Sequence, residues 1–255
     1  MSTVSLHYTV DGPPDGPVLL LGSSIGTNTE LWASQVPVLA ARHRVVRYDH
    51  RGHGRSPVPR GSYRLADLGG DVLALMDRLG CARASLGGVS LGGMVSMWVA
   101  GHAPERVDRL VLVCTSAKLP ENLWAERAQI ARTEGLPALA DRVIARWVTP
   151  DYARANPDTM ARLRSMFLST PAAGYAACCD AIRTMELEPV LSRIEAPTLV
   201  VACLEDQATP PEHARRILAD IPRSRLALVA GAAHLPTVSH PELIAQLVKD
   251  FLDDS

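Results

Sequence analysis

The chain lacks the features that would direct it to a membrane or to a nucleic acid. No apolar run approaches the roughly 20 residues that cross a bilayer, and the first residues show no basic stretch followed by an apolar one, as a signal peptide would. The 26 Lys and Arg residues nearly balance the 27 Asp and Glu residues, so no excess of one sign favours a phosphate backbone or a charged lipid surface. We therefore expect a cytoplasmic protein that binds neither nucleic acid nor membrane.

Cysteine is scarce as well, and its distribution argues against disulfide bonds and against a metal site. The five cysteines are odd in number and lie mostly in apolar runs, and the neighbours Cys178 and Cys179 do not have the spacing of metal ligands. Cysteines of this kind are typical of buried thiols in a reducing compartment. The sequence therefore predicts free, buried thiols and no metal site.

What the chain does have is an alternation of short β-type runs and helical segments. Hydrophobic residues make up 47% of its 255 positions, enough for one large domain with an insertion. Runs rich in β-formers predict strands at residues 4–10, 18–21, 44–48, 84–87, 109–114, 197–203 and 225–230. Helices are expected at residues 67–79 and 94–100, and from a capping-box pattern at residues 239–242 up to residue 251. Such alternation predicts an α/β fold, with a mostly parallel sheet flanked by helices.

One motif carries specific chemistry. The run Gly88-Val89-Ser90-Leu91-Gly92 matches G-x-S-x-G and lies between a predicted strand and a predicted helix. A serine at such a sharp turn is held in a strained conformation that exposes its hydroxyl, and the flanking glycines avoid collisions that a Cβ would cause. This context predicts that Ser90 is a nucleophile rather than a helix-capping serine. Leu91 would then supply one backbone N–H to an oxyanion hole, and the loop after the second strand would supply another.

The groups that a serine nucleophile needs follow Ser90 in the expected order, an acid and then a histidine. Glu205 and Asp206 come just after the sixth predicted strand, and His234 comes just after the last one. The carboxyl ends of parallel strands lie at the edge where open α/β sheets bind ligands. His234 is therefore predicted to be the general base, and one of the two carboxylates is predicted to orient it.

The other histidines have contexts that fit this role less well. His50 and His53 lie in a tight loop and are expected to stabilise that turn, and His102 lies at the end of a helix. Four more are expected to be exposed: His7, His43, His213 and His240.

The stretch of residues 120–188 interrupts the alternation, because it is rich in helix formers and arginines and has few β-type runs. Trp124 and Trp147 fall inside it. We expect a helical lid inserted over the C-terminal edge of the sheet, with residues 1–119 and 189–255 forming the core. The alternative is a set of ordinary helices that cover the sheet.

Along nearly its whole length the chain resembles the 3-oxoadipate enol-lactonases, which have the α/β-hydrolase fold. The matching positions are residues 21–27, Trp32, Gln35 and residues 47–56, 88–93, 103–107, 146–147, 174–179 and 208–212. Ser23-Ser24, in place of the usual His-Gly, and the Gly-Tyr-Ala-Ala-Cys-Cys run at 174–179 favour this branch over generic esterases. Residues 203–205 depart from the pattern, because such enzymes usually carry glycine and small residues before the acid.

The resemblance implies roles for particular residues. It implies that Asp206 pairs with His234, although the departure just before it leaves Glu205 as a rival. It also selects Ile25 as the second backbone donor of the oxyanion hole, with Gly26 allowing a close approach.

The resemblance further implies that the protein hydrolyses 3-oxoadipate enol-lactone to 3-oxoadipate, in the β-ketoadipate pathway of aromatic catabolism. The reaction would use a Ser-His-Asp acyl-enzyme mechanism without a metal or organic cofactor, and the expected partner is a small-molecule lactone or ester. A free carboxylate on that substrate matches a guanidinium, for which Arg127 and Arg146 are candidates unless they are surface charges. Trp124 and Trp147 are expected either to wall the pocket or to pack inside the lid.

Two other functions stay open. The same triad would serve another carboxylesterase, lactonase or C–C bond hydrolase, including one in a biosynthetic pathway. A binding protein that kept the fold without catalysis would retain a ligand without turning it over.

Overall fold

The computed structural model describes residues 3–254. Seven strands form one sheet in the order β1-β3-β2-β4-β5-β6-β7. Their bounds are β1 Tyr8–Asp11, β2 Val18–Gly22, β3 Arg44–Tyr48, β4 Ala84–Val89, β5 Val107–Val113, β6 Thr198–Cys203 and β7 Ser224–Val229. β1 pairs antiparallel with β3, and every other pair is parallel. The prediction of a mostly parallel α/β sheet is confirmed.

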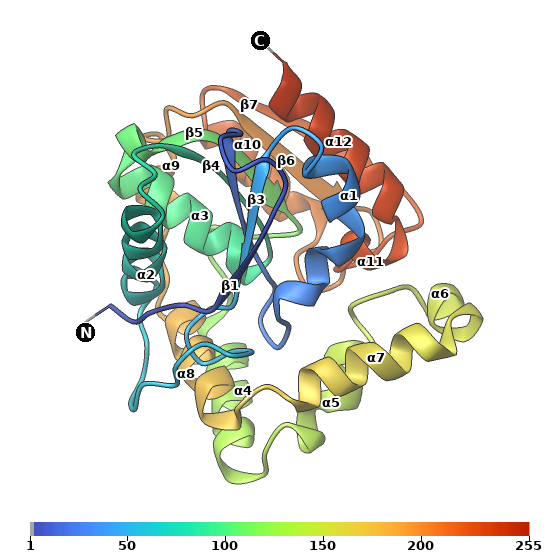
Figure 1. Cartoon of the computed structure of the whole chain (residues 1–255). Coiled ribbons are helices and arrows are strands. Elements are labelled where there is room, and N and C mark those ends of the chain that lie inside the picture. Colours follow the sequence, from blue (N-terminus) through green and yellow to red (C-terminus); the bar gives the residue numbers. More distant parts are fainter. Residues whose placement is uncertain (1–2, 255) are drawn as a thin grey trace.

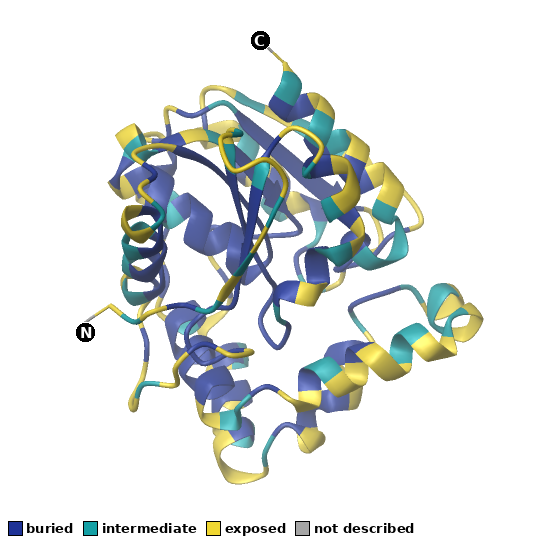
Figure 2. Ribbon diagram, viewed as in Figure 1, coloured by how far each residue is buried: buried dark blue, intermediate teal, exposed yellow. Residues whose placement is uncertain are grey.

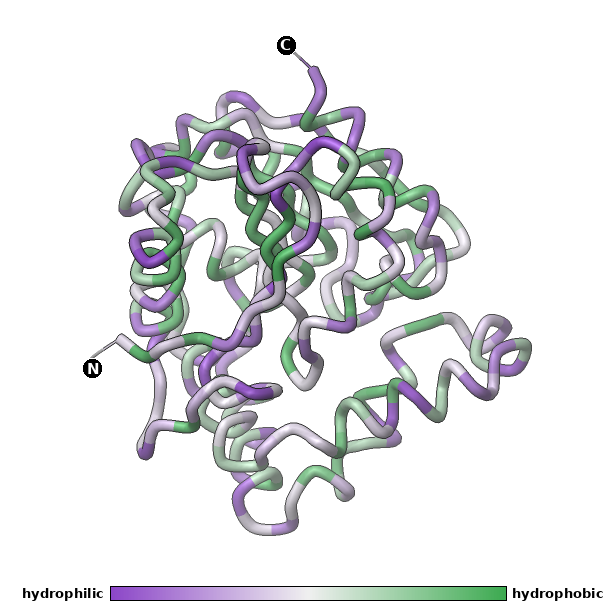
Figure 3. The backbone as a smooth tube through the Cα atoms, viewed as in Figure 1, coloured by the Kyte–Doolittle hydropathy of each residue, from purple (hydrophilic) through white to green (hydrophobic). Residues whose placement is uncertain are grey.

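The central strands are buried on both faces, as their near-continuous apolar runs predict. Every residue of β4 and β6 is buried, whereas the edge strands β1 and β7 are partly exposed. Figure 3 shows the hydrophobic residues gathered along the middle of the sheet. The first strand is shorter than expected and begins only at Tyr8.

Helices cover both faces of the sheet. Figure 1 shows α1 (Val36–Leu39) and α12 (Pro241–Asp253) on one side, and α2 (Leu65–Arg78) and α3 (Leu91–His102) on the other. Helix α2 buries the apolar stripe that its 3.6-residue period predicts, while its opposite face stays exposed (Figure 2). The shorter helices of the core are η1 Thr29–Gln35, η2 Pro104–Arg106, α9 Glu188–Leu191, α10 Pro211–Asp220 and α11 Pro236–Ser239.

The capping box expected before α12 does not form. Ser239 ends helix α11, and His240 becomes the N-cap of α12 without a side-chain cap bond. Pro241 occupies the first helical position, where a missing N–H costs nothing. The hydroxyl of Ser239 instead contacts Nδ1 of His240 at 2.9 Å. The pattern predicted Ser239 in a capping box at the start of α12, but Ser239 is the last residue of α11.

Five helices and no strand occupy the described segment between β5 and α9. They are α4 Glu121–Thr133, α5 Pro137–Ile144, α6 Pro150–Ala155, α7 Pro157–Leu168 and α8 Ala172–Arg183. They lie beyond the carboxyl edge of the sheet (Figure 1). A Cβ added to Gly52, in the loop after β3, would lie 2.6 Å from Cα of Gly174 in α8. The helical insertion therefore packs directly on the loops that follow the strands.

Two further expectations concern cysteines and membrane spans. All five cysteines are buried and free, as expected. Within residues 3–254, no helix combines the length and the apolar character that a membrane crossing requires.

Candidate active site

The turn between β4 and α3 holds Ser90 in an unusual backbone conformation. Its φ is 54° and its ψ is −112°, a region that residues with a Cβ rarely adopt. A Cβ on Gly88 would lie 2.1 Å from the carbonyl carbon of Gly92, and a Cβ on Gly92 would lie 2.3 Å from the oxygen of Gly22. The two glycines of the motif therefore permit the close crossing that presents the Ser90 side chain at the end of the strand.

His234 and Asp206 meet at the ends of β7 and β6. Nδ1 of His234 lies 2.9 Å from Oδ2 of Asp206. The Asp206 carboxylate also accepts bonds from the N–H groups of Ala208 and Thr209 and from the Thr209 hydroxyl, at 2.7, 3.1 and 2.8 Å. Burial alone would raise the pKa of Asp206, but the neighbouring His234 and these donors outweigh it and leave that pKa lowered.

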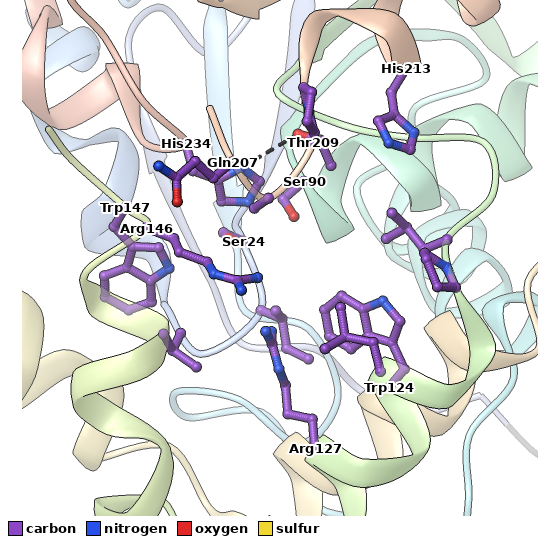
Figure 4. A pocket seen from close by; sticks show the side chains of 17 residues that line it. Ser24, Ser90, Trp124, Arg127, Arg146, Trp147, Gln207, Thr209, His213 and His234 are labelled. Carbon is purple, nitrogen blue, oxygen red and sulfur yellow. Dashed lines mark hydrogen bonds between the residues drawn. The ribbon is translucent and has the colours of Figure 1, made fainter. Parts of the chain in front are cut away.

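This pairing sets the orientation of the imidazole. Because the ionised Asp206 can only accept, Nδ1 of His234 carries the proton and Nε2 is left with a free lone pair. Figure 4 shows Ser90 beside the His234 ring, and both residues line the same cavity. The arrangement can move a proton from the serine to the histidine while the aspartate stabilises the resulting charge.

The rival carboxylate, Glu205, points elsewhere. It is exposed, and Oε2 accepts the backbone N–H of Ala232 at 3.1 Å. The carboxylate in contact with His234 is thus that of Asp206.

The backbone N–H groups of Ile25 and Leu91 have no acceptor among the described residues. The loop that carries Ile25 is tied to the turn that carries Ser90, since the N–H of Gly92 donates to the carbonyl of Ser23 at 3.1 Å. Unpaired amides at such a turn are the donors that an oxyanion hole needs.

His50 and His53 hold this same loop, which goes beyond the expected stabilisation of their own turn. Nε2 of His53 accepts the N–H of Gly26 at 2.9 Å, and Nε2 of His50 lies 3.0 Å from the carbonyl of Ser23, to which it donates. Burial lowers the pKa of His50 to about 3 and that of His53 to about 4. Both rings are therefore neutral at pH 7, and the bond to Gly26 requires that Nε2 of His53 carry no proton.

A cavity of about 230 Å³ lies between these groups and the insertion. Ser90 and His234 line it from the core, and the insertion contributes Trp124, Arg127, Arg146 and Trp147. Figure 4 shows both guanidinium groups extending into this space. The volume is below the range of roughly 300–1,000 Å³ that suits drug-sized ligands, so the cavity favours a small substrate.

The two arginines in the cavity differ from the other arginines of the insertion. Five of those others pair with carboxylates: Arg132, Arg142, Arg154, Arg164 and Arg183. The exposed Arg162 donates to a threonine hydroxyl. Within residues 3–254, neither Arg127 nor Arg146 has a carboxylate partner, although only 7% of Arg127 is exposed.

Arg127 is held by an aromatic ring rather than by an acid. Its guanidinium carbon lies 4.5 Å from the centre of the Trp124 ring, a contact that suits a cation. Trp147 packs edge-on against Phe167 at 5.8 Å between ring centres. Both tryptophans are buried and both also line the cavity. Each therefore walls the pocket and packs inside the insertion at the same time.

The expectation that four histidines are exposed is wrong. His43 is buried, and the three others, His7, His213 and His240, are half-buried. His7 lies against the buried carboxylate of Asp49, with 3.0 Å between Nδ1 and Oδ2. Contacts with distant parts of the chain, which the local sequence does not reveal, help to cover these rings, as between His7 and Asp49 or His213 and Ser116.

His213, at the start of α10, lines the cavity. The Ser116 hydroxyl donates to the carbonyl of Lys118 at 2.6 Å, so it accepts from Nδ1 of His213 at 2.8 Å. Burial lowers the pKa of His213, and Arg216 lowers it further against two nearby carboxylates. The ring is therefore neutral at pH 7, with Nε2 as a hydrogen-bond acceptor.

Sequence reasoning gave no role to three cavity residues: Ser24, Gln207 and His213. A signal was available for two of them, because Ser24 and Gln207 lie on the loops that follow the carboxyl ends of β2 and β6. Extending the search from the triad to every polar residue on these loops would have found both. His213 lies in α10, and only the fold brings it to the cavity.

The open parallel sheet, the strained serine after β4 and the His–Asp pair after β7 and β6 are the features of an α/β hydrolase. Residues 17–241 match the family described as alpha/beta hydrolase fold. The chain belongs to this family.

Individual relatives narrow the class further. The chain is 36% identical to 3-oxoadipate enol-lactonase 2 of Acinetobacter baylyi, an alignment that covers 96% of this chain and 92% of the relative. It is 32% identical to RutD of Variovorax paradoxus, provisionally named a carbamate hydrolase, over 97% of this chain and 96% of that protein. The crystal structure of the enol-lactonase from Burkholderia xenovorans LB400 superposes with a TM-score of 0.96 at 38% identity, over 98% of this chain and 96% of that one. The protein is thus similar to enol-lactonases and is a hydrolase that acts on esters or lactones.

Proposed function

We propose that this protein opens 3-oxoadipate enol-lactone to 3-oxoadipate with Ser90 as nucleophile, His234 as base and Asp206 as the group that orients the base. The observation that carries the proposal is the pair of lid guanidinium groups, Arg127 and Arg146, that line the same cavity as Ser90 without a carboxylate partner. The free, buried thiols agree with action in the cytoplasm.

In the first step Ser90 Oγ adds to the lactone carbonyl carbon as its proton passes to Nε2 of His234. The negative charge that develops on the carbonyl oxygen is stabilised by the N–H groups of Ile25 and Leu91. Asp206 stabilises the imidazolium and keeps Nδ1 protonated.

The tetrahedral intermediate then collapses and the bond from the carbonyl carbon to the ring oxygen breaks. His234 gives its proton to that oxygen, which leaves as an enol still attached to the acyl chain. The enol takes up a proton on carbon and releases one from oxygen to become a ketone, so the group that could close the ring again is lost.

Water completes the cycle. His234 accepts a proton from a water molecule as its oxygen adds to the acyl carbon, and the second intermediate again places its charge between Ile25 and Leu91. Collapse returns the proton to Ser90 Oγ and releases 3-oxoadipate, a small dicarboxylate.

The carboxylate that the substrate already carries explains the lid arginines. A buried guanidinium without an anion is costly, because desolvation is not repaid by a partner. Arg127 stacks on Trp124 and therefore presents its planar fork in a fixed orientation, which suits a carboxylate. A small anionic lactone meets both the size and the charge of the cavity.

The second candidate is an esterase, lactonase or carbamate hydrolase for a neutral substrate. It is favoured by the carbamate hydrolase name of one relative. Against it stands the positive charge of the cavity, which a neutral substrate would leave unpaired.

The test compares the enol-lactone with its neutral methyl ester on wild type and on Arg127→Met and Arg146→Met. A charge-assisted contact contributes about 1.5 to 3 kcal/mol, or about ten- to a hundredfold in kcat/KM. We expect wild type to prefer the acid by that factor and at least one of the two variants to lose the preference. Arg162→Met is the matched control, because Arg162 also lacks an acidic partner within residues 3–254 but is exposed and lines a different cavity.

Each other outcome has a separate meaning. Equal rates on acid and ester would favour the neutral-substrate hydrolase. An unchanged ratio in both variants would make these arginines unrelated to selectivity. Retention of the lactone without turnover would indicate a binding protein.

A further inference from the structure

The hydroxyl of Ser24 is buried and has no hydrogen-bond partner within the described residues. Ser24 is only 1% exposed and lines the cavity together with Ser90 and His234. Buried hydroxyls are almost always hydrogen-bonded, and one that is not calls for an explanation. The cavity location points to a group on a bound ligand.

The adjacent serine provides an internal comparison. Ser23 is equally buried, but its hydroxyl donates to the carbonyl of Asn28 at 2.8 Å and closes the loop on itself. The two neighbours thus have the same chemistry and burial, and only one of them is already used by the fold.

The backbone of Ser24 is fixed even though its hydroxyl is free. Its carbonyl accepts both the N–H of Thr27, at 3.1 Å, and the hydroxyl of the same threonine, at 2.7 Å. On either side, Ser23 is tied to Gly92 and Gly26 is tied to His53. The side chain therefore stands on a preorganised loop, as a group that stabilises a transition state should.

We propose that the Ser24 hydroxyl is a third donor of the oxyanion hole, beside the N–H groups of Ile25 and Leu91. Ser24 directly precedes Ile25, and Figure 4 shows it at the same end of the cavity as Ser90 and His234. The hydroxyl donates its proton in a hydrogen bond to the carbonyl oxygen of the substrate as that oxygen becomes negative. No bond is made or broken at Ser24.

This inference rests on the proposed role of Ser90 as nucleophile but not on the identity of the lactone. It concerns the charge that appears on any ester or lactone carbonyl, so it applies equally if the natural substrate is a neutral ester. The choice of substrate therefore allows the two proposals to be tested apart.

The test uses Ser24→Ala, Ser23→Ala and Ser24→Thr, with p-nitrophenyl acetate as a substrate that carries no carboxylate. We expect Ser24→Ala to lower kcat by about ten- to a hundredfold, with little change in KM, because the donor acts on the transition state. Ser24→Thr keeps a hydroxyl and should recover most of this loss. Binding of a boronic acid, which forms a tetrahedral adduct on Ser90, should weaken in Ser24→Ala by a similar factor.

Stability separates this role from a structural one. Ser24→Ala removes an unpaired buried hydroxyl and should not lower the melting temperature, whereas Ser23→Ala breaks a bond within the loop and should lower it. A Ser24→Ala enzyme with full kcat and unchanged boronic acid affinity would overturn the inference. So would a loss of activity that follows a loss of folding. If Ser90→Ala kept its activity on the same ester, the proposed nucleophile itself would be wrong.

Discussion

The neutral histidines behind residues 23–27, the proposed oxyanion loop, make the stability of this protein depend on pH in a way that one substitution can reveal. His53 accepts the N–H of Gly26, so protonation of Nε2 would remove the acceptor and place a charge in a fully buried site. Burial lowers the pKa of His53 to about 4, against the opposing effects of the Arg51 carbonyl and the Asp49 carboxylate. In the unfolded chain the same ring titrates near its ordinary pKa of 6.5.

The pKa values of His53 in the folded and unfolded states determine whether stability rises or falls with pH. Between pH 6.5 and 4 the unfolded state binds a proton that the folded state does not, so the free energy of unfolding falls as the pH falls. From pH 7.5 to pH 5 a site with these pKa values costs about 2 kcal/mol. His50, with its pKa lowered to about 3 by burial and by His53, adds a loss of similar size. Together they remove a large part of a typical stability of roughly 5–15 kcal/mol.

The measurement is urea unfolding of wild type and His53→Gln at pH 7.5 and pH 5. Glutamine places an oxygen near the position of Nε2 and can accept the Gly26 N–H, but it does not titrate. We expect the variant to lose about 2 kcal/mol less than wild type over this interval, with an unchanged m-value. Carboxylates titrate in both proteins and cancel in the comparison. Equal losses in the two proteins would refute the idea that the fold holds His53 neutral.

Two further predictions test the triad. Ser90→Ala should lower kcat on esters by about a millionfold while urea unfolding stays close to wild type, and activity within tenfold of wild type would remove Ser90 from its role. Asp206→Asn should lower kcat by about 10⁴ through the wrong imidazole tautomer, while Glu205→Gln should stay near wild type because the Glu205 carboxylate accepts the Ala232 N–H and His234 pairs with Asp206. A greater loss of kcat in Glu205→Gln would exchange the two assignments.

The sheet and the sharp turn at Ser90 could be predicted because they depend on local patterns. Apolar β-type runs predict buried parallel strands, and Gly88 is required by its close contact with Gly92 inside the motif itself. The acid and the histidine each come after the carboxyl end of a strand, and this position predicts that they lie at the same edge of the sheet as Ser90.

The choice between neighbouring residues could not be read from the sequence in the same way. Ser23 and Ser24 are identical in type, and only the contact with Asn28 shows which hydroxyl is occupied. Likewise, nothing in the local sequence separates Arg127 from the paired Arg132 one turn later, since the partner Asp180 lies on α8. Whether a hydroxyl or a guanidinium is free depends on partners from other parts of the chain, and only the three-dimensional structure shows these partners.

Contacts between the insertion and the oxyanion loop limit how substrate selection can be studied. A Cβ on Gly26 would lie 2.7 Å from the ring of Phe167, and the ring of Tyr175 is nearly as close. Helices α7 and α8 of the insertion therefore pack on the loop that carries Ile25, while Arg127 lies on α4 and Arg146 follows α5. Deleting the insertion would expose apolar surface and release this loop, so a loss of activity would not distinguish selection from catalysis. Replacement of single guanidinium groups, with Arg162→Met as control, leaves these packing contacts in place and separates the two effects.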